Sequence, residues 1–547
     1  MVLMSFLNFL DIKFFNKNIV ILLAFGIILF LAIDLRIYNL NKVYTEYDDI
    51  GVLTFHKGNA GTREGNYDYT VLKKTISFSW ETLRNLENSY LLPLYVAFGW
   101  TYSPGQYLLY PMILSDDDDY EMKVFKGRFV SVLSSVATLI LLFWLFIKLN
   151  NGLNWAALFP VSIFVFSQNS ILYAHHMSPY STYCLSTVGG LFLIILAVEK
   201  KITTYTACLI NTALLYFSYM NILIFMPLLW IEYHRGNLKT FIFSYFAEKK
   251  NLLFFNSLLI FPVLILFLLK MKQKGNFGTG RGVVIPNAED FVSIISAPIY
   301  ALKQLFIASQ SLFMGFFPTG LPLVFAVFFL VVFVAVAYFG IFRIQVAYKV
   351  FFYALIIYLF QWLFLYTLSK LPLDQTRHAL IFFPVLLSMV FVFFSYLKLP
   401  NLFYIVLCLT AVPFSYGEAK NLIDQKTSNF DFEFIEKQNV EHIFLYSFTE
   451  SPLLYFEGEK TVLNVDVNAF KVAYVNSKMP ETFLLVSQDQ PLKSYKPGLQ
   501  GRFPGMFSDY IIETLVEKST GQYFPYNNYK VVSQQNGFYV YRFSRIN

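Results

Sequence analysis

The chain has 547 residues, of which 56% are hydrophobic, 19% aromatic and only 14% charged. An ordinary soluble domain carries roughly a quarter charged residues, so this composition excludes a chain that hides its apolar surface in soluble cores alone. The formal net charge is +7, and the basic residues are scattered, which excludes the clustered basic face of a nucleic-acid-binding protein.

The apolar residues come in long runs separated by short polar breaks. A hydrocarbon layer of about 30 Å needs roughly 20 helical residues to cross it. Such runs occupy residues 18–38, 128–148, 155–171, 181–198, 204–217, 221–231, 252–269, 321–339, 350–365, 379–394 and 402–416. The sequence therefore predicts a mainly α-helical polytopic membrane protein with about 11 transmembrane helices.

Lys and Arg predict the orientation of these helices. With the N-terminus and its Lys13 and Lys17 in the cytoplasm, every alternate loop on that side carries basic residues. The loops predicted outside are 39–127, 175–180, 270–320 and 366–378, followed by the whole C-terminal region. The runs 204–217 and 221–231 are each shorter than a full crossing. We keep them as two helices because the loop charges then agree, whereas one broken helix would invert everything downstream.

Two further segments, 90–110 and 291–317, suit helices that lie in the membrane interface. From Gly417 onward the composition becomes mixed. Strand-like runs occur at 442–446, 482–486 and 529–532, and a turn at 534–537 leads into 538–543 as a closing hairpin. The predicted organisation is a transmembrane domain at 1–416, which includes the outer loop 39–127, and a small extracytoplasmic α/β or α+β domain at 417–547.

Three carboxylates follow the first predicted span within four residues, and they are Glu46, Asp48 and Asp49. A carboxylate beside the bilayer is placed to accept a proton from a hydroxyl nucleophile. Acids at this position also solvate the end of a helix in many membrane proteins. The residue types alone leave both interpretations open.

Four short motifs, taken in order, resemble the GT-C superfamily of polytopic glycosyltransferases, which includes protein O-mannosyltransferases and the enzymes that put aminoarabinose on lipid A. The motifs are Asp48-Asp49 after the first helix, Leu92-Pro93-Leu94-Tyr95 in the first loop, Gly127-Arg128 with Ser131 at the second helix, and Thr376-Arg377-His378 with Pro384 before a late span. The resemblance covers roughly residues 18–397. It departs at Asn88 and Ser89, where the lipid A-modifying members have a Lys.

The resemblance implies a transferase that moves a sugar from a polyprenyl-phosphate donor to an acceptor hydroxyl, with inversion at the anomeric carbon. Asp48 is then the expected base that deprotonates the acceptor, through an oxocarbenium-like transition state. Asp49 or Glu46 orients the acceptor or a cation. Implied partners are the lipid-linked donor, a lipid, glycan or protein acceptor, and the bilayer, without nucleic acid.

The leaving phosphate needs positive charge more than a general acid. Arg377 is the expected cation, with a snorkelling arginine as the alternative. His378, Arg128 and Tyr95 are further expected substrate contacts. Lys272 and Lys274 lie in a basic outer loop that either clamps the lipid phosphate or tethers to anionic headgroups.

The sequence assigns no cofactor and leaves a divalent cation open. The acidic run 116–119 lacks the glycine and spaced ligands of a calcium loop, and His175-His176 is expected to pack at the interface. The resemblance places the chain in a bacterial inner (cell) membrane. A lipid or glycan transporter or flippase is the alternative function, which usually requires internal repeats and polar residues at the bilayer midplane.

Overall fold

The computed structural model describes part of the chain. The described residues are 17–43, 49, 52, 103–115, 117–118, 120–150, 152–239, 312, 346–367, 377–397, 399–426, 440, 442–446, 461–464, 482–487, 529–535 and 539–545. The chain divides into two compact units. The first contains Met1–Tyr38, Thr101–Gln106 and Arg128–Ile423, and the second contains Asn39–Trp100, Tyr107–Gly127 and Asp424–Asn547.

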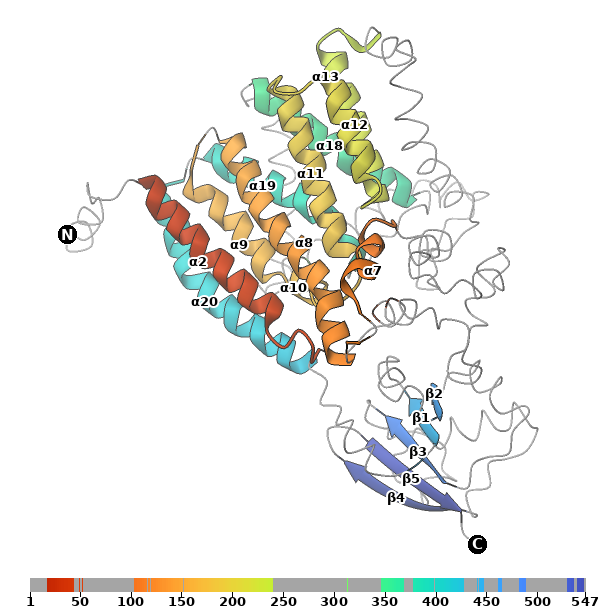
Figure 1. The fold of residues 1–547 in the computed structure, drawn as a ribbon. Coiled ribbons are helices and arrows are strands. Elements are labelled where there is room, and N and C mark those ends of the chain that lie inside the picture. Colours follow the sequence, from red (N-terminus) through yellow and green to blue (C-terminus); the bar gives the residue numbers. More distant parts are fainter. Residues whose placement is uncertain are drawn as a thin grey trace, which may run out of the picture. The chain divides into compact units, whose positions relative to one another are not determined.

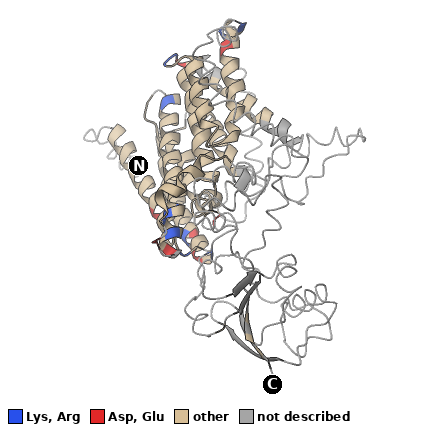
Figure 2. Ribbon diagram, turned by 45° about the vertical axis from the view of Figure 1, so that its right-hand side comes forward, with Lys and Arg blue, Asp and Glu red and all other residues tan. Residues whose placement is uncertain are grey.

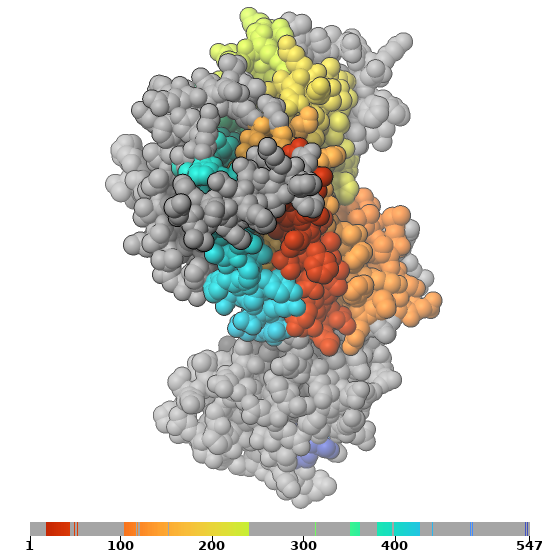
Figure 3. Space-filling view, turned by 90° about the vertical axis from the view of Figure 1, so that its left-hand side faces the viewer, coloured from red at the N-terminus to blue at the C-terminus, as the bar shows by residue number. Residues whose placement is uncertain are grey.

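Four described helices are long and apolar enough to cross a membrane, and the protein is an integral membrane protein. They are α2 (Lys17–Ile37), α8 (Tyr120–Leu149), α11 (Tyr180–Val198) and α20 (Asn401–Lys426). Charged residues lie mainly towards the two ends of the helical bundle, and the stretch between them is apolar (Figure 2). Helices α2 and α20 lie side by side along one face (Figures 1 and 3).

The predicted span 155–171 is not one continuous helix. It consists of η4 (Trp155–Ala157), α9 (Leu158–Phe166) and α10 (Gln168–Leu172), with a break at Ser167. Ser167 adopts extended backbone, with φ −60° and ψ 125°, while its N–H still donates to the carbonyl of Ile163. The break turns the chain after α9.

The two shortest predicted spans form an antiparallel hairpin. Helix α12 (Thr204–Leu214) has 11 residues and α13 (Ile222–His234) has 13, joined through η5 (Tyr219–Asn221). Thr204 at the start of α12 bonds to Glu232 near the end of α13, and Asn211 bonds to the carbonyl of Asn221 at the other end. At 1.5 Å per residue the helices measure about 16 and about 20 Å. The chain reverses direction, so the alternative of one broken helix is wrong.

The remaining described helices complete the bundle. Helix α18 (Val346–Thr367) packs on α13, and η6 (Arg377–Phe382) leads into α19 (Phe383–Leu397), which packs against α9 and α11. Aromatic pairs fill this core, since the rings of Phe146 and Phe391 stack at 4.6 Å and those of Phe159 and Phe394 meet edge to face at 4.9 Å. The predicted spans 252–269 and 321–339 lie outside the described residues. Most residues of the predicted interfacial segments 90–110 and 291–317 also lie outside them.

The second unit contains two short helical elements, η3 (Gln106–Leu108), which begins on the last residue of the first unit, and α7 (Tyr110–Ile113). It also contains a mixed five-stranded sheet in the order β2-β1-β3-β5-β4. Its strands are β1 (His442–Tyr446), β2 (Thr461–Asn464), β3 (Thr482–Ser487), β4 (Tyr529–Gln535) and β5 (Tyr539–Arg545). Strand β1 pairs in parallel with β2 and β3, and β5 pairs antiparallel with β3 and β4. The three predicted strands and the closing antiparallel pair of β4 and β5 are confirmed, and β2 was not predicted. Gln534 and Gln535, predicted in the turn, belong to β4. An extracytoplasmic domain that begins at Gly417 stays a prediction, and α20 runs through that position.

Candidate functional site

One end of the bundle holds Arg128 and the backbone of Arg377 and His378, two of the residue sets that the sequence singles out. Helix α2 ends there and α11 begins there, and we call it the loop end. Element η6, which opens with Arg377 and His378, packs against α10 and α11. The Cys184 Sγ–H of α11 donates to the carbonyl of Leu380 at 2.9 Å. The backbone of η6 is therefore bonded to α11 three residues after Arg377.

Arg128 and His175 are both fully buried near this end. The His175 Nδ1 lies 2.9 Å from the carbonyl oxygen of Ile171, and its Nε2 lies 3.1 Å from that of Tyr38. Burial lowers the pKa of His175 to about 4, electrostatic interactions with Arg128 and His176 lower it further, and the bonds to the two carbonyls oppose the shift. A neutral imidazole has one N–H, so at neutral pH His175 donates to one of the two carbonyls.

Arg36 is a buried cation in α2 that the sequence analysis missed. Its Nε donates to the Ser135 hydroxyl at 2.7 Å and its Nη2 to the Ser170 hydroxyl at 2.8 Å, while Nη1 reaches the carbonyl of Ala32 at 3.1 Å. The guanidinium thus joins α2 to α8 and α10. The available signal was an ionisable residue inside a predicted span, which is rare and marks a functional or structural requirement.

The other side of α2 is held by α20. The Tyr416 hydroxyl donates to the Asp34 carboxylate, and the Lys420 Nζ lies 3.5 Å from the same carboxylate. The Lys420 ammonium also lies 4.6 Å from the centre of the Tyr38 ring. Arg36, Asp34 and Tyr38 therefore fix the last turns of α2 from several directions, directly before the segment that carries the predicted catalytic acids.

The structure describes only some of the predicted site residues. Asp49, in the second unit, has a fully buried side chain. Arg128 is placed on α8, and only the backbone of Arg377 and His378 is described. The predicted base and four further predicted contacts lie outside the described residues, namely Asp48, Glu46, Tyr95, Lys272 and Lys274.

The acidic run 116–119 has a structural role at Asp118. The Lys126 ammonium donates to both carboxylate oxygens of Asp118, at 2.7 and 2.8 Å, and the Ser115 N–H donates to the same group at 3.0 Å. The bond from Lys126, followed by that from Ser115, lowers the pKa of Asp118. Among the residues placed by the structure, no group of three or more His, Cys, Asp or Glu gathers as a metal site. A divalent cation stays open.

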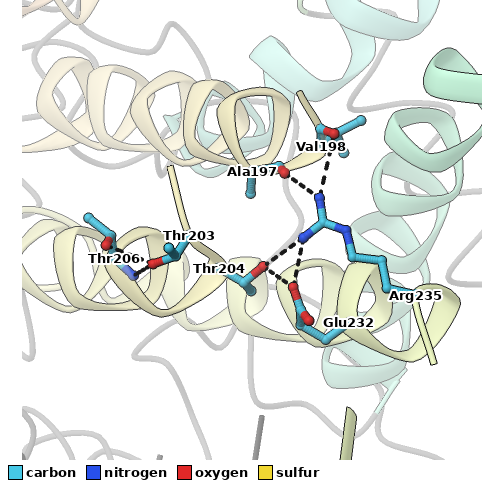
Figure 4. A network of polar contacts seen from close by, with 7 residues as sticks. All are labelled: Ala197, Val198, Thr203, Thr204, Thr206, Glu232 and Arg235. Atoms are coloured by element: carbon cyan, nitrogen blue, oxygen red, sulfur yellow. Dashed lines mark hydrogen bonds and ion pairs between the residues drawn. The ribbon is translucent and has the colours of Figure 1, made fainter. Parts of the chain in front are cut away.

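The opposite end of the bundle carries a second polar network, drawn in Figure 4. The Arg235 Nη2 donates to the carbonyls of Ala197 and Val198, the last residues of α11, at 2.5 and 3.5 Å. Its Nη1 donates to the Glu232 carboxylate at 2.8 Å and reaches the Thr204 hydroxyl at 3.4 Å. These contacts join the ends of α11, α12 and α13, so the network is a structural clamp.

Comparisons with known proteins leave the family of the chain open. No known protein-family model and no curated protein matches it. Among solved structures, ArnT from Cupriavidus metallidurans bound to undecaprenyl phosphate is similar, with 11% sequence identity and a TM-score of 0.46. The similarity covers 94% of this chain and 97% of that chain. A likeness at this level assigns neither a family nor an activity.

Proposed function

We propose that the chain is a membrane glycosyltransferase of the GT-C type that moves a sugar from a polyprenyl-phosphate donor to an acceptor hydroxyl at the loop end, with inversion. The observation that carries the proposal is the burial of two ionisable residues from the predicted motifs. Asp49 and Arg128 are each fully buried. A charged group is costly to bury, so such residues more often serve a site than a surface.

The proposed chemistry divides between acids and cations. Asp48 takes the proton of the acceptor hydroxyl as its oxygen attacks the anomeric carbon, and the bond to the lipid phosphate breaks on the opposite face. Asp49 orients the acceptor. Arg377, with Arg128 and His378, stabilises the negative charge that develops on the leaving phosphate. The contacts of Arg36, Asp34 and Tyr38 support these roles, because they fix the end of α2, where the segment with both acids begins.

The proposal is tested by sugar transfer in membranes. A panel of radiolabelled polyprenyl-phosphate sugars is offered to wild type, Asp48→Asn, Arg377→Ala and the control Asp117→Asn, which alters an exposed acid outside the proposed site. Asp48→Asn is expected to lower the transfer rate by about 100-fold or more, because it removes the general base. Arg377→Ala is expected to lower it as well, and Asp117→Asn to match wild type.

Two outcomes contradict the proposal. If wild type consumes no donor, the glycosyltransferase assignment fails, and the alternative of a lipid or glycan transporter is tested next by following a fluorescent lipid across a vesicle membrane. If wild type transfers sugar and Asp48→Asn is equally active, the assignment of the base is wrong.

A further inference from the structure

Four residues of the first loop lie inside the bundle. They are Ser103, Pro104, Gly105 and Gln106, all of them buried, and we call them the re-entrant segment. They belong to the first compact unit, although the residues on both sides, Asn39–Trp100 and Tyr107–Gly127, belong to the second. Non-helical backbone at membrane depth is tolerated only where protein or a water-filled cavity surrounds it. The partners of this segment therefore decide its role.

The backbone of the segment is bonded to the tip of the α12–α13 hairpin. The Gly105 N–H donates to the carbonyl of Tyr216 at 2.7 Å, and the Tyr219 N–H donates to the Ser103 hydroxyl at 2.8 Å. The Ser103 N–H donates to the Tyr183 hydroxyl of α11 at 3.0 Å. A Cβ on Gly105 would lie 2.7 Å from the Tyr216 carbonyl oxygen, so only glycine allows this approach.

The amide of Gln106 is bonded at both of its ends. Its Nε2 donates to the Ser131 hydroxyl of α8 at 3.3 Å and to the carbonyl of Ser178 at 3.2 Å. Its Oε1 accepts a bond from the Thr182 hydroxyl of α11 at 2.5 Å, and that hydroxyl lies 3.1 Å from the Ser134 hydroxyl. One side chain thus joins α8, α11 and the turn before α11.

The length of the hairpin explains why the segment enters the bundle. Asn221 at the tip donates to the carbonyl of Ser186, and the Ser186 hydroxyl donates to the carbonyl of Leu214. Ser186 lies six residues after the start of α11, which is about 9 Å along a helix. The hairpin therefore stops short of the loop end, and the re-entrant segment occupies the remaining depth beside α11.

We propose that the re-entrant segment anchors the first loop in the membrane bundle and that Gln106 is a positioning residue for the proposed transfer. This inference rests on the proposed function, because the same loop carries Asp48 and Asp49. Gln106 touches no reacting atom. It acts by holding its loop in one register against α8, α11 and the hairpin tip, so the reacting groups meet in one geometry.

Hydrogen exchange of the full-length protein in nanodiscs tests the anchor without any substrate. Gln106→Leu keeps the size of the side chain and removes its bonds. Gln361→Leu is the matched control, because the Gln361 Nε2 donates to the carbonyls of Leu223 and Ile357 at 3.1 and 3.2 Å, which also joins two helices. Peptides from residues 103–115 are expected to exchange about 10-fold faster in Gln106→Leu and at the wild-type rate in Gln361→Leu. Equal exchange in the two variants would overturn the anchor.

Transfer kinetics test the positioning role. Gln106→Leu is expected to lower kcat by about 10- to 100-fold with little change in the KM for the donor, because misplaced groups react slowly. Gln361→Leu is expected to keep the wild-type kcat at a similar melting temperature. An unchanged kcat in Gln106→Leu would refute positioning.

If wild type transfers no sugar, the proposed function fails and the exchange result still decides the anchor. If Gln106→Leu does not fold, Thr182→Val, which removes the bond to Oε1, takes its place in both measurements.

Discussion

His175 couples the stability of the bundle to pH. Its pKa is lowered to about 4 in the folded protein, against about 6.5 for an exposed histidine. The unfolded chain therefore binds this proton first as the pH falls. His175 therefore leaves the free energy of unfolding unchanged above about pH 7. Between about pH 6.5 and about pH 4, its protonation in the unfolded chain lowers the free energy of unfolding by about 3 kcal/mol.

Thermal melting in detergent between pH 8 and pH 4.5 checks this expectation. His175→Gln is expected to melt with a shallower dependence on pH than wild type, because the titrating group is gone. His234→Gln, which changes an exposed histidine, serves as the control and is expected to follow wild type. Parallel curves for wild type and His175→Gln would refute the assignment.

Arg36 makes a nearby serine unusually sensitive to substitution. Ser135→Ala leaves the Arg36 Nε without its acceptor at 2.7 Å and is expected to cost about 1–3 kcal/mol. Ser162→Ala is a matched control in the same core, since the Ser162 hydroxyl donates to the carbonyl of Leu158 one turn earlier in its own helix. That substitution is expected to have a small effect. The melting temperatures of the two variants test this expectation, and Ser135→Ala is expected to melt at the lower temperature. Equal melting temperatures would count against the role of Arg36.

At the scale of elements, Arg235 is expected to stabilise the α12–α13 hairpin more than a surface ion pair does. Arg235→Ala removes the bonds to the α11 carbonyls and leaves the largely buried Glu232 carboxylate without this cation, at a cost of about 2–3 kcal/mol. Lys148→Ala breaks the more exposed pair with Glu199 at the same end, and about 0–1 kcal/mol is expected. Denaturant titration measures the free energy of unfolding of both variants. A larger decrease in Lys148→Ala than in Arg235→Ala would contradict the structural clamp.

Hydropathy located the apolar parts of α2, α8, α11, α18 and α20 but not their exact bounds. Helix α8 begins at Tyr120, ahead of the predicted start at Arg128, and α20 continues past the predicted end at residue 416 to Lys426. In both helices the extra turns contain charged residues, which lower their hydropathy, and Lys126 and Lys420 bond to Asp118 and Asp34 there. Three of the strands and the closing β-hairpin were predictable because short runs rich in β-branched and aromatic residues are a local signal. Keeping α12 and α13 as two helices depended on the charges of the loops.

The candidate site was less predictable than the fold. Arg128 was found by its motif. Arg36 and Gln106 were not, because their roles come from partners about 25 to 134 residues away that only the folded bundle supplies. A long-range hydrogen bond to a serine or a carbonyl leaves no pattern in the sequence.

At the scale of the whole molecule, the predicted orientation can be checked by labelling single cysteines. The three native cysteines are Cys184, Cys208 and Cys408, of which the first two are buried, and a background with all three replaced carries one new thiol at a time. Asp117→Cys, predicted outside, is expected to react with a membrane-impermeant maleimide in intact cells. Asn237→Cys, at an exposed position predicted inside, is expected to react only after permeabilisation. The reverse pattern would invert the predicted topology.

The re-entrant segment also sets an order for folding during synthesis. The Ser103 hydroxyl accepts its bond from Tyr219, a residue made 116 positions later. At about 5–20 residues per second, the first loop waits roughly 6 to 23 seconds for that partner. Helix α8 is made during that interval, since Leu149 follows Ser103 by 46 residues, while the bond from Tyr219 cannot yet form. A nascent chain stalled before Tyr216 should therefore lack the bonds between the re-entrant segment and the hairpin tip, and gain them only when the hairpin has entered the membrane.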